Sequence, residues 1–262
     1  MKLKVGWIQY ANVYPIFYVL EKEGLLTDDI HFVKGVPSQL NWALRNELIH
    51  LSPSSSVEYL LNEELYDYID EICIASKEYV GSVLFFSNRD LRSLDGEKIL
   101  LTDQSATSHL LLRVILEKFY GLNPKYDISH APQLGNSFLL IGDDALRMNK
   151  SCRDKKIYDL GNIWYRETGL PFVFALWIIR KEILSPDHEV HNNYIIFKDK
   201  LLYARDRAKD YFKEMVKDYY LRDFMTEEEI IRYWMENMDY YLTDAHKKSL
   251  NLFKEYLLEI VK

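Results

Sequence analysis

The chain lacks the motifs that identify several large enzyme classes. Its 262 residues contain no G-x-G-x-x-G, no G-x-x-x-x-G-K-[S/T] and no G-x-S-x-G sequence. The first two motifs bind phosphates at the start of a helix, and the third exposes a reactive serine. Assignment as a dinucleotide-binding protein, a P-loop nucleotidase or a serine hydrolase therefore loses its main support.

Cysteine and paired histidine are scarce. Cys73 and Cys152 are the only cysteines and show no C-x-x-C spacing, which favours a reducing compartment over a disulfide-stabilised fold. His188 and His191 form the only close histidine pair, and the proline and aspartate before them indicate a solvated loop. We therefore expect no metal site.

Long apolar stretches are also missing. No run approaches the 18 apolar residues typical of a membrane-spanning helix. The opening residues, M-K-L-K-V-G-W-I-Q-Y, become polar too soon for a signal peptide. We expect a cytoplasmic protein without a membrane partner.

Acidic residues outnumber basic residues. Lys and Arg number 33 against 40 Asp and Glu, giving a net charge of −7, which argues against nucleic acid as a partner. An anionic ligand would therefore depend on local donors and not on a general positive field. Because hydrophobic residues make up 48% of the chain, a sizeable core in one large domain or two lobes is expected.

The order of strand, polar turn and helix recurs three times in the first half of the chain. Predicted strands 2–10, 49–51 and 99–101 lead into turns that contain Asn12, the hydroxyl-rich run 52–56, and Ser105, Thr107 and Ser108. A helix start presents N–H groups that suit an anion, although each of these side chains could instead be an N-cap or turn former. Their repetition favours a cleft built from helix N-termini.

Two further junctions carry polar groups. Gly81 and Ser82 place an N–H and a hydroxyl at the head of a predicted strand. Another apolar strand ends in Gly142, Asp143 and Asp144, where two carboxylates meet a helix start. We expect one of these carboxylates to cap the helix.

Alternating strands and helices predict an α/β fold with a mostly parallel sheet. A middle segment that could form a second lobe, followed by closing helices, predicts two lobes. We place lobe I at 1–86 plus 176–262, and lobe II at 87–175.

Several short motifs follow one another along the first two thirds of the chain. They are Y-A-N-x-x-P from Tyr10, S-P-S-S-x-V-E-Y from Ser52, G-S-V from Gly81, D-x-S-x-T-S from Asp103, I-G-D from Ile141, D-L-G from Asp159 and T-G-L-P-F-V-F-A-x-W from Thr168. Together they resemble the motifs of one family, the chorismate dehydratases of the futalosine route to menaquinone. The sister enzyme, 1,4-dihydroxy-6-naphthoate synthase, opens with a Ser-Pro-Cys-Pro-Asn-Asp type of motif, and the Gln9–Asn12 segment differs from it.

The resemblance implies a type II periplasmic-binding-protein-like fold, with two α/β lobes, a ligand cleft between them and C-terminal helices. It implies a hydro-lyase that converts chorismate, a small dicarboxylate, into 3-[(1-carboxyvinyl)oxy]benzoate and water. No metal or organic cofactor is implied. Whether the chain forms a homodimer stays open.

The expected site residues follow from the motifs. We expect one carboxylate at Ser105, Thr107 and Ser108, the other at Ser54, Ser55 and Ser82, and further substrate contacts at Val83 and Gly142. Asn12 would lie near the reacting carbon and orient it. We assign Asn12 no role as a base, because an amide is too weak a base to remove the C3 proton. The base would be Asp143 or the substrate's own side-chain carboxylate, and the residues do not decide between them. A binding protein or sensor for small carboxylates, and the sister synthase, remain alternative functions.

Overall fold

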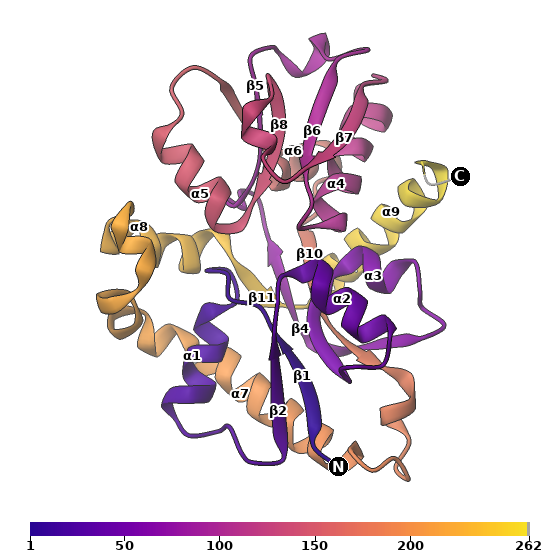
Figure 1. Cartoon of the computed structure of the whole chain (residues 1–262), viewed down its shortest axis with the longest axis vertical. Coiled ribbons are helices and arrows are strands. Elements are labelled where there is room, and N and C mark those ends of the chain that lie inside the picture. The colour runs from indigo at the N-terminus through magenta and orange to yellow at the C-terminus, as the bar shows by residue number, and fades with distance from the viewer. Residues whose placement is uncertain (261–262) are drawn as a thin grey trace. The chain divides into compact units, whose positions relative to one another are not determined.

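The computed structural model describes residues 1–260, apart from the side chain of residue 218. By its internal contacts the chain divides into two compact units, Met1–Ile74 with Ala175–Leu242, and Ala75–Phe174 with Thr243 onward. Each unit contains its own β-sheet (Figure 1). The chain passes between the units within strands β4 (Tyr66–Ser76) and β10 (Phe172–Arg180), and again after Leu242.

The boundaries expected from the sequence differ from this division in two elements. Strand β5 (Val83–Ser87) and helix α9 (Asp244–Ile260) both belong to the second unit. Trp164 Nε1 donates to Ser249 Oγ of α9 at 2.9 Å, and Arg113 Nη2 donates to the Ile260 carbonyl at 3.1 Å. These bonds tie the last helix to the second unit although it lies far away in sequence.

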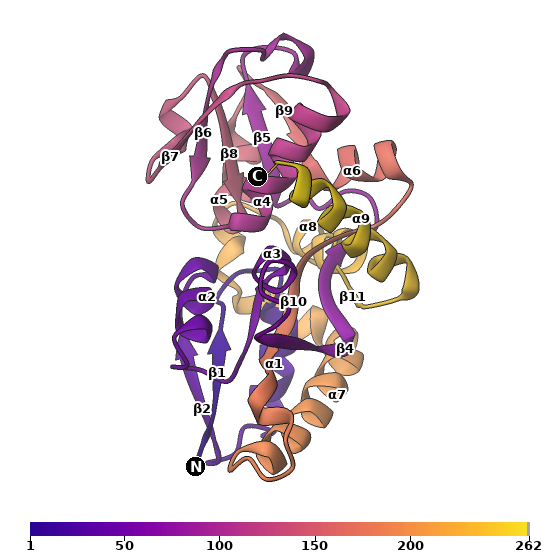
Figure 2. The same ribbon diagram turned by 90° about the vertical axis from the view of Figure 1, so that its right-hand side faces the viewer.

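The first unit has a six-stranded sheet in the order β11-β4-β10-β3-β1-β2. Its other strands are β1 (Leu3–Trp7), β2 (Ile30–Lys34), β3 (Leu51–Ser55) and β11 (Asp239–Tyr241), and its helices are α1 (Tyr14–Lys22), α2 (Pro37–Arg45), α3 (Ser56–Leu60), α7 (His191–Met215) and α8 (Glu227–Arg232). Strand β1 is parallel to β2 and β3, whereas β10 is antiparallel to β3. Helices α1 and α7 lie side by side (Figures 1 and 2).

Aromatic side chains supply much of the core of the first unit. Phe17, Trp177, Phe197 and Trp234 are each at most 1% exposed. Full burial of such a side chain contributes roughly 1.5–3 kcal/mol. The many aromatic residues of this chain are thus largely structural here.

Strand β3 corrects one expectation. The segment 52–56 was expected to be a turn after a strand at 49–51, but Leu51–Ser55 forms a strand of the sheet interior with all five residues buried. It pairs with β1 on one side and with β10 on the other, where Trp177 lies opposite Pro53. Pairing with two neighbours outweighs the weak strand propensity of serine and proline.

The second unit has a five-stranded sheet in the order β7-β6-β8-β5-β9. Its other strands are β6 (Lys98–Thr102), β7 (Lys125–Ser129), β8 (Ser137–Ile141) and β9 (Lys156–Asp159), and its other helices are α4 (Ala106–Arg113), α5 (Gly142–Ser151) and α6 (Leu160–Thr168). Strand β6 is parallel to β7 and β8, whereas β5 is antiparallel to β8 and β9. Leu84, Phe86, Phe138, Leu140 and Ala145 form a buried core cluster between this sheet and α5.

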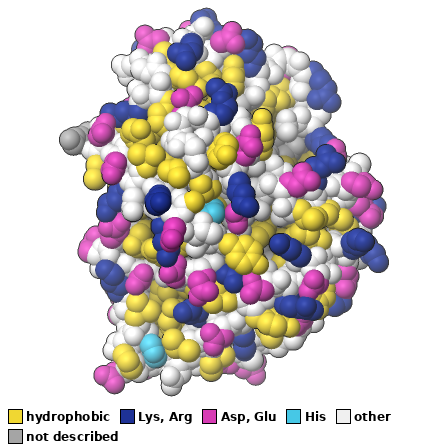
Figure 3. Space-filling view, turned by 180° about the vertical axis from the view of Figure 1, so that it is seen from behind, with side chains coloured by type: hydrophobic (Ala, Val, Ile, Leu, Met, Phe, Trp, Pro, Cys, Tyr) yellow, Lys and Arg dark blue, Asp and Glu magenta, His cyan; other side chains and the backbone are white. Residues whose placement is uncertain are grey.

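The surface agrees with the acidic composition. On the face shown in Figure 3, Lys and Arg side chains are interspersed with Asp and Glu, and no broad basic area is present. Among the residues that the structure describes, no helix combines the length and the apolar character needed to cross a membrane.

A buried histidine links β1 to β3. His50 is 9% exposed, and its Nδ1 accepts the backbone N–H of Lys4 at 2.9 Å. Burial lowers the pKa of this imidazole, and the nearby His188 and Lys4 lower it further. Burial likewise lowers the pKa of His109 in α4. Protonation of either ring is therefore less favourable in the folded chain than in the unfolded chain.

This arrangement predicts that stability falls in mild acid. Below the ordinary histidine pKa of about 6.5 the unfolded chain binds more protons than the folded chain, so the free energy of unfolding falls as the pH falls. Urea unfolding between pH 8 and pH 5 should show this loss in the parent protein. The loss should be smaller in His50→Asn, whose amide oxygen can still accept the Lys4 N–H. Parallel curves for His50→Asn and the parent would contradict the assignment.

Candidate functional site

Two of the expected site segments meet at one edge of the sheet of the first unit. Parallel pairing of β1 with β3, in which Val5 lies opposite Leu51, directs the carboxyl ends of both strands to the same edge. Asn12 lies in the turn after β1, and Ser54 and Ser55 end β3. The topology therefore brings together the polar groups of two motifs that lie about forty residues apart in the sequence.

Asn12 does not cap helix α1. Val13 occupies the N-cap position, and no side chain accepts a hydrogen bond there. The Oδ1 atom of Asn12 is buried and has no hydrogen-bond partner within the described structure. A buried acceptor without a donor is uncommon in folded proteins and is consistent with a ligand group or a water filling that place.

The turn that carries Asn12 is held by a tryptophan from the far end of the chain. Trp234 Nε1 donates to the Ala11 carbonyl at 2.9 Å, and its ring is 1% exposed. The ring stacks on Tyr14 with the centroids 6.0 Å apart. No sequence motif marks Trp234, so this support of the Asn12 turn emerges only from the fold.

The two serines of β3 differ in their partners. Ser54 is fully buried, and its hydroxyl has no hydrogen-bond partner among the described residues. Ser55 is 4% exposed, and its Oγ accepts a hydrogen bond from Asn41 Nδ2 of α2 at 2.8 Å. Asn41 was not among the expected residues. A polar residue between the apolar Leu40 and Leu44 was the only sequence signal for it.

The remaining expected residues all gather at one edge of the second sheet. The carboxyl ends of β6, β8 and β9 and the start of β5 lie at this edge. Val83 pairs with Ile141, and the Gly142 N–H donates to the Ser82 carbonyl at 2.7 Å. Ser82 was grouped with Ser54 and Ser55 from the sequence, but it belongs to the second unit, next to Gly142.

The start of α4 carries three buried hydroxyls. Ser105 is the N-cap, and its Oγ accepts the Ser108 N–H at 3.3 Å and lies 3.1 Å from Ser108 Oγ. Thr107 and Ser108 are 1% and 2% exposed. The cap interpretation is therefore correct for Ser105, and the cap also groups the hydroxyls at a helix start, where the helix dipole favours an anion.

Helix α5 begins without a carboxylate cap. Its N-cap is Ile141, and no side chain accepts a hydrogen bond there. The expectation that Asp143 or Asp144 caps the helix is therefore wrong, because both lie within the first turn. Gly142 adopts a φ of +58°, which a glycine tolerates at this sharp entry into the helix.

Asp159 fixes the loop that presents Ser82. This N-cap of α6 accepts the backbone N–H groups of Asn162, Val80 and Gly81 at 3.0, 3.2 and 2.7 Å. Burial raises the pKa of this carboxyl, while the backbone donors act in the opposite direction. The D-L-G motif at Asp159 marked this position without revealing its partners.

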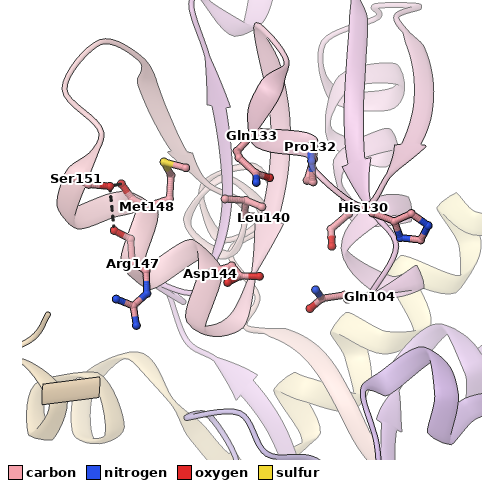
Figure 4. A pocket seen from close by; sticks show the side chains of 10 residues that line it. Gln104, His130, Pro132, Gln133, Leu140, Asp144, Arg147, Met148 and Ser151 are labelled. Carbon is pink, nitrogen blue, oxygen red and sulfur yellow. Dashed lines mark hydrogen bonds between the residues drawn. The ribbon is translucent and has the colours of Figure 1, made fainter. Parts of the chain in front are cut away.

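A small cavity of about 270 Å³ lies beside the same edge. Its walls come from α5, from Leu140 of β8, from Thr102 at the end of β6, and from segments that follow β6 and β7. Figure 4 shows the Asp144 side chain of α5 and the Gln104 side chain that follows β6 on facing sides of the pocket. Gln104 directly precedes Ser105 in the chain.

The structure shows no metal cluster in the described chain. No group of three or more His, Cys, Asp or Glu side chains gathers there in a manner that could hold an ion. The paired histidines make local contacts instead: His191 Nδ1 lies 2.9 Å from the Ile183 carbonyl, and His188 Nδ1 accepts the Val190 N–H at 3.4 Å.

The chain is similar in sequence to one protein family and to two of the proteins named below. The model of a family described as menaquinone biosynthesis matches residues 3–259. The chorismate dehydratase of Thermus thermophilus is 27% identical over 272 residues, covering 97% of this chain and 94% of that protein. The chorismate dehydratase of Campylobacter jejuni is 27% identical over 255 residues, covering 93% and 92%.

Solved structures show the same fold. Protein AF1704 of Archaeoglobus fulgidus superposes with a TM-score of 0.74 at 18% identity, covering 98% of this chain and 97% of that one. The alkanesulfonate-binding protein SsuA of Xanthomonas axonopodis, solved with bound MOPS, superposes with a TM-score of 0.69 at 11% identity, covering 98% and 92%. The predicted periplasmic-binding-protein-like α/β fold is confirmed.

Proposed function

The chain belongs to the menaquinone biosynthesis family, and we propose that it is a chorismate dehydratase, converting chorismate into 3-[(1-carboxyvinyl)oxy]benzoate and water. The observation that carries this proposal is the similarity to proteins named chorismate dehydratase along nearly the whole chain. Each unit carries buried hydroxyls of the kind that donate to a carboxylate, Ser54 and Ser55 in the first and Ser105, Thr107 and Ser108 in the second.

The chemistry asks little of the protein beyond positioning and proton transfer. Chorismate loses the proton at C3 and the hydroxyl at C4, and the electron pair of the C3–H bond becomes the new ring double bond. The hydroxyl leaves with a proton as water, so atoms and charge balance. Because the ring becomes aromatic, the reaction is strongly downhill, and the barrier depends on orientation and on acid–base groups.

Hydrogen bonds to the ring carboxylate would lower this barrier. The C3 proton is conjugated to that carboxylate through the ring, so negative charge flows toward it as the proton leaves. We assign Ser105, Thr107, Ser108 and the start of α4 to one carboxylate. We assign Ser54 and Ser55 to the other, with Ser82, Val83 and Gly142 contributing further contacts. Donors fixed before the reaction act as an oxyanion hole does.

The base is Asp143 or the substrate's own side-chain carboxylate. Asp143 lies in the first turn of α5 and is half-buried. The enol-ether carboxylate belongs to the same molecule as the C3 proton, so it could act without any protein base. A variant separates these two routes.

The reaction itself is the first test. Purified protein incubated with chorismate and no added cofactor should yield a product lighter by one water, detected by liquid chromatography with mass spectrometry. Intact chorismate together with a raised melting temperature would instead identify a binding protein. Intact chorismate without a thermal shift would overturn the substrate assignment, and the sister naphthoate synthase reaction would be tested next.

Asn12→Ala should slow turnover more than it weakens binding. Loss of the orienting amide near the reacting carbon should lower kcat by about 10- to 100-fold while KM changes by less than about threefold. Asn46→Ala is the matched control, because this exposed amide donates to the Trp42 carbonyl at the end of α2. An unchanged kcat in Asn12→Ala would remove Asn12 from the mechanism.

Asp143→Asn decides between the two bases. If Asp143 removes the C3 proton, kcat should fall by about 100-fold or more, with the melting temperature unchanged. If the substrate carboxylate acts, the variant should retain most of its activity. Asp144→Asn, one residue away in the same helical turn, controls for the loss of a negative charge at the start of α5.

A further inference from the structure

We propose that Asn41 is a positioning residue for the substrate, because it fixes the Ser55 hydroxyl as a donor to a substrate carboxylate. This inference rests on the proposed function, which supplies the carboxylate. It adds a residue from α2 to a site otherwise built from strand ends and helix starts.

The geometry singles out the contact between these two side chains. Asn41 is 7% exposed and Ser55 is 4% exposed, and Asn41 Nδ2 lies 2.8 Å from Ser55 Oγ. Ser55 also occupies the N-cap position of α3, yet its side chain accepts no hydrogen bond from that helix. A serine at this position usually accepts a backbone N–H. Here the amide of Asn41 takes that place.

The chemistry of the contact sets the direction of the hydroxyl. A serine hydroxyl has one O–H donor and two lone pairs, whereas an amide nitrogen only donates. The Nδ2 atom of Asn41 therefore occupies a lone pair of Ser55 Oγ, and this nitrogen cannot accept the hydroxyl proton. The O–H of Ser55 is thus directed away from Asn41, as binding of a carboxylate requires.

Helix α2 is locked in place one turn beyond Asn41. Arg45, four residues later on the same helix face, binds Glu58 of α3 through Nε–Oε1 at 3.2 Å and Nη2–Oε2 at 2.5 Å. The Glu58 side chain is 4% exposed and also accepts the Tyr66 hydroxyl at 3.3 Å. This ion pair, in which Glu58 is buried and Arg45 is 54% exposed, holds α2 against α3 and so keeps Asn41 at Ser55.

A purely structural role does not explain an amide at this position. The neighbouring Leu40 and Leu44 are at most 1% exposed, so leucine would pack here. The Oδ1 atom of Asn41 is buried and has no hydrogen-bond partner within the described residues. An amide with one unsatisfied atom is a poor choice for packing alone. Its donor function toward Ser55 accounts for its presence.

A double-mutant cycle with Ser55→Ala tests the inference. Loss of one hydrogen bond to a carboxylate should raise KM for chorismate about tenfold in Ser55→Ala, and Asn41→Ala should raise it several-fold with little change in kcat. The double variant should match Ser55→Ala alone, because Asn41 acts through Ser55. Asn46→Ala, at the end of the same helix, should keep KM within about twofold of the parent.

The outcomes separate this inference from the proposed function. Turnover by the parent with an unchanged KM in Asn41→Ala, or with independent effects that multiply in the double variant, overturns the role of Asn41 and leaves the function standing. If the parent binds chorismate without turnover, calorimetric dissociation constants replace KM in the same cycle. A parent that neither binds nor converts chorismate overturns both. If Asn41→Ala does not fold, Asn41→Asp replaces it in the cycle. Aspartate keeps the shape of the side chain, and its carboxylate draws the Ser55 proton toward residue 41. Asn46→Asp is the control for the added negative charge.

Discussion

The pairing of β3 with neighbours on both sides is the constraint on which the polar edge of the first unit depends. The strand contains three serines and a proline, and its five residues are all buried. Strand β1 pairs with it at Leu51, and strand β10 pairs with it from Leu51 to Ser55, so the segment is a strand and not a turn. Ser54 and Ser55 are therefore held on a rigid element and not on a mobile loop, which suits a site that must orient a small ligand.

The candidate donors of the second unit are also held in place, but by helix caps and not by strand pairing. They lie in turns that Asp159 and Ser105 stabilise. Asp159 gathers the N–H groups of Val80, Gly81 and Asn162, which fixes the entry into β5 while capping α6. Ser105 does the same at α4, where its cap groups two further hydroxyls. Capping interactions that stabilise the helices thus also arrange candidate donors.

Lys and Arg side chains contribute little to the proposed substrate contacts. Arg45, Arg180 and Arg205 are engaged in ion pairs with Glu58, Glu47 and Asp206. The donors assigned to the substrate are hydroxyls, amides and helix starts. Neutral donors avoid the cost of burying a cation whenever no ligand is bound, and they are compatible with a net charge of −7.

Much of the fold could be predicted from the sequence, because alternating strands and helices and the short motifs are local signals. The apolar run Phe172–Ile179, for example, predicts a strand, and the structure has one at Phe172–Arg180. Strand β3 is not predictable in the same way, since its pairing partners decide its structure and its own residues favour a turn. The placement of α9 also depends on distant contacts, through Trp164 and Arg113.

The residues of the candidate site also fall into those that the sequence marks and those whose roles depend on the fold. Asn12, Ser105 and Gly142 lie at junctions that the sequence marks, so they could be named in advance. Asp159 and Trp234 act through partners far away in the chain, and Asn41 acts through Ser55, which lies on another element 14 residues later. Their roles depend on tertiary hydrogen bonds, and a single sequence carries no record of those.

Proton magnetic resonance of chorismate incubated with the purified protein tests the central claim most directly. A dehydratase must make the ring aromatic and leave the enol-ether side chain attached. We expect aromatic ring signals to replace the signals of the protons at C3 and C4, while both vinyl protons of the side chain persist and no pyruvate appears. Release of pyruvate, or a chorismate spectrum that does not change, would contradict it.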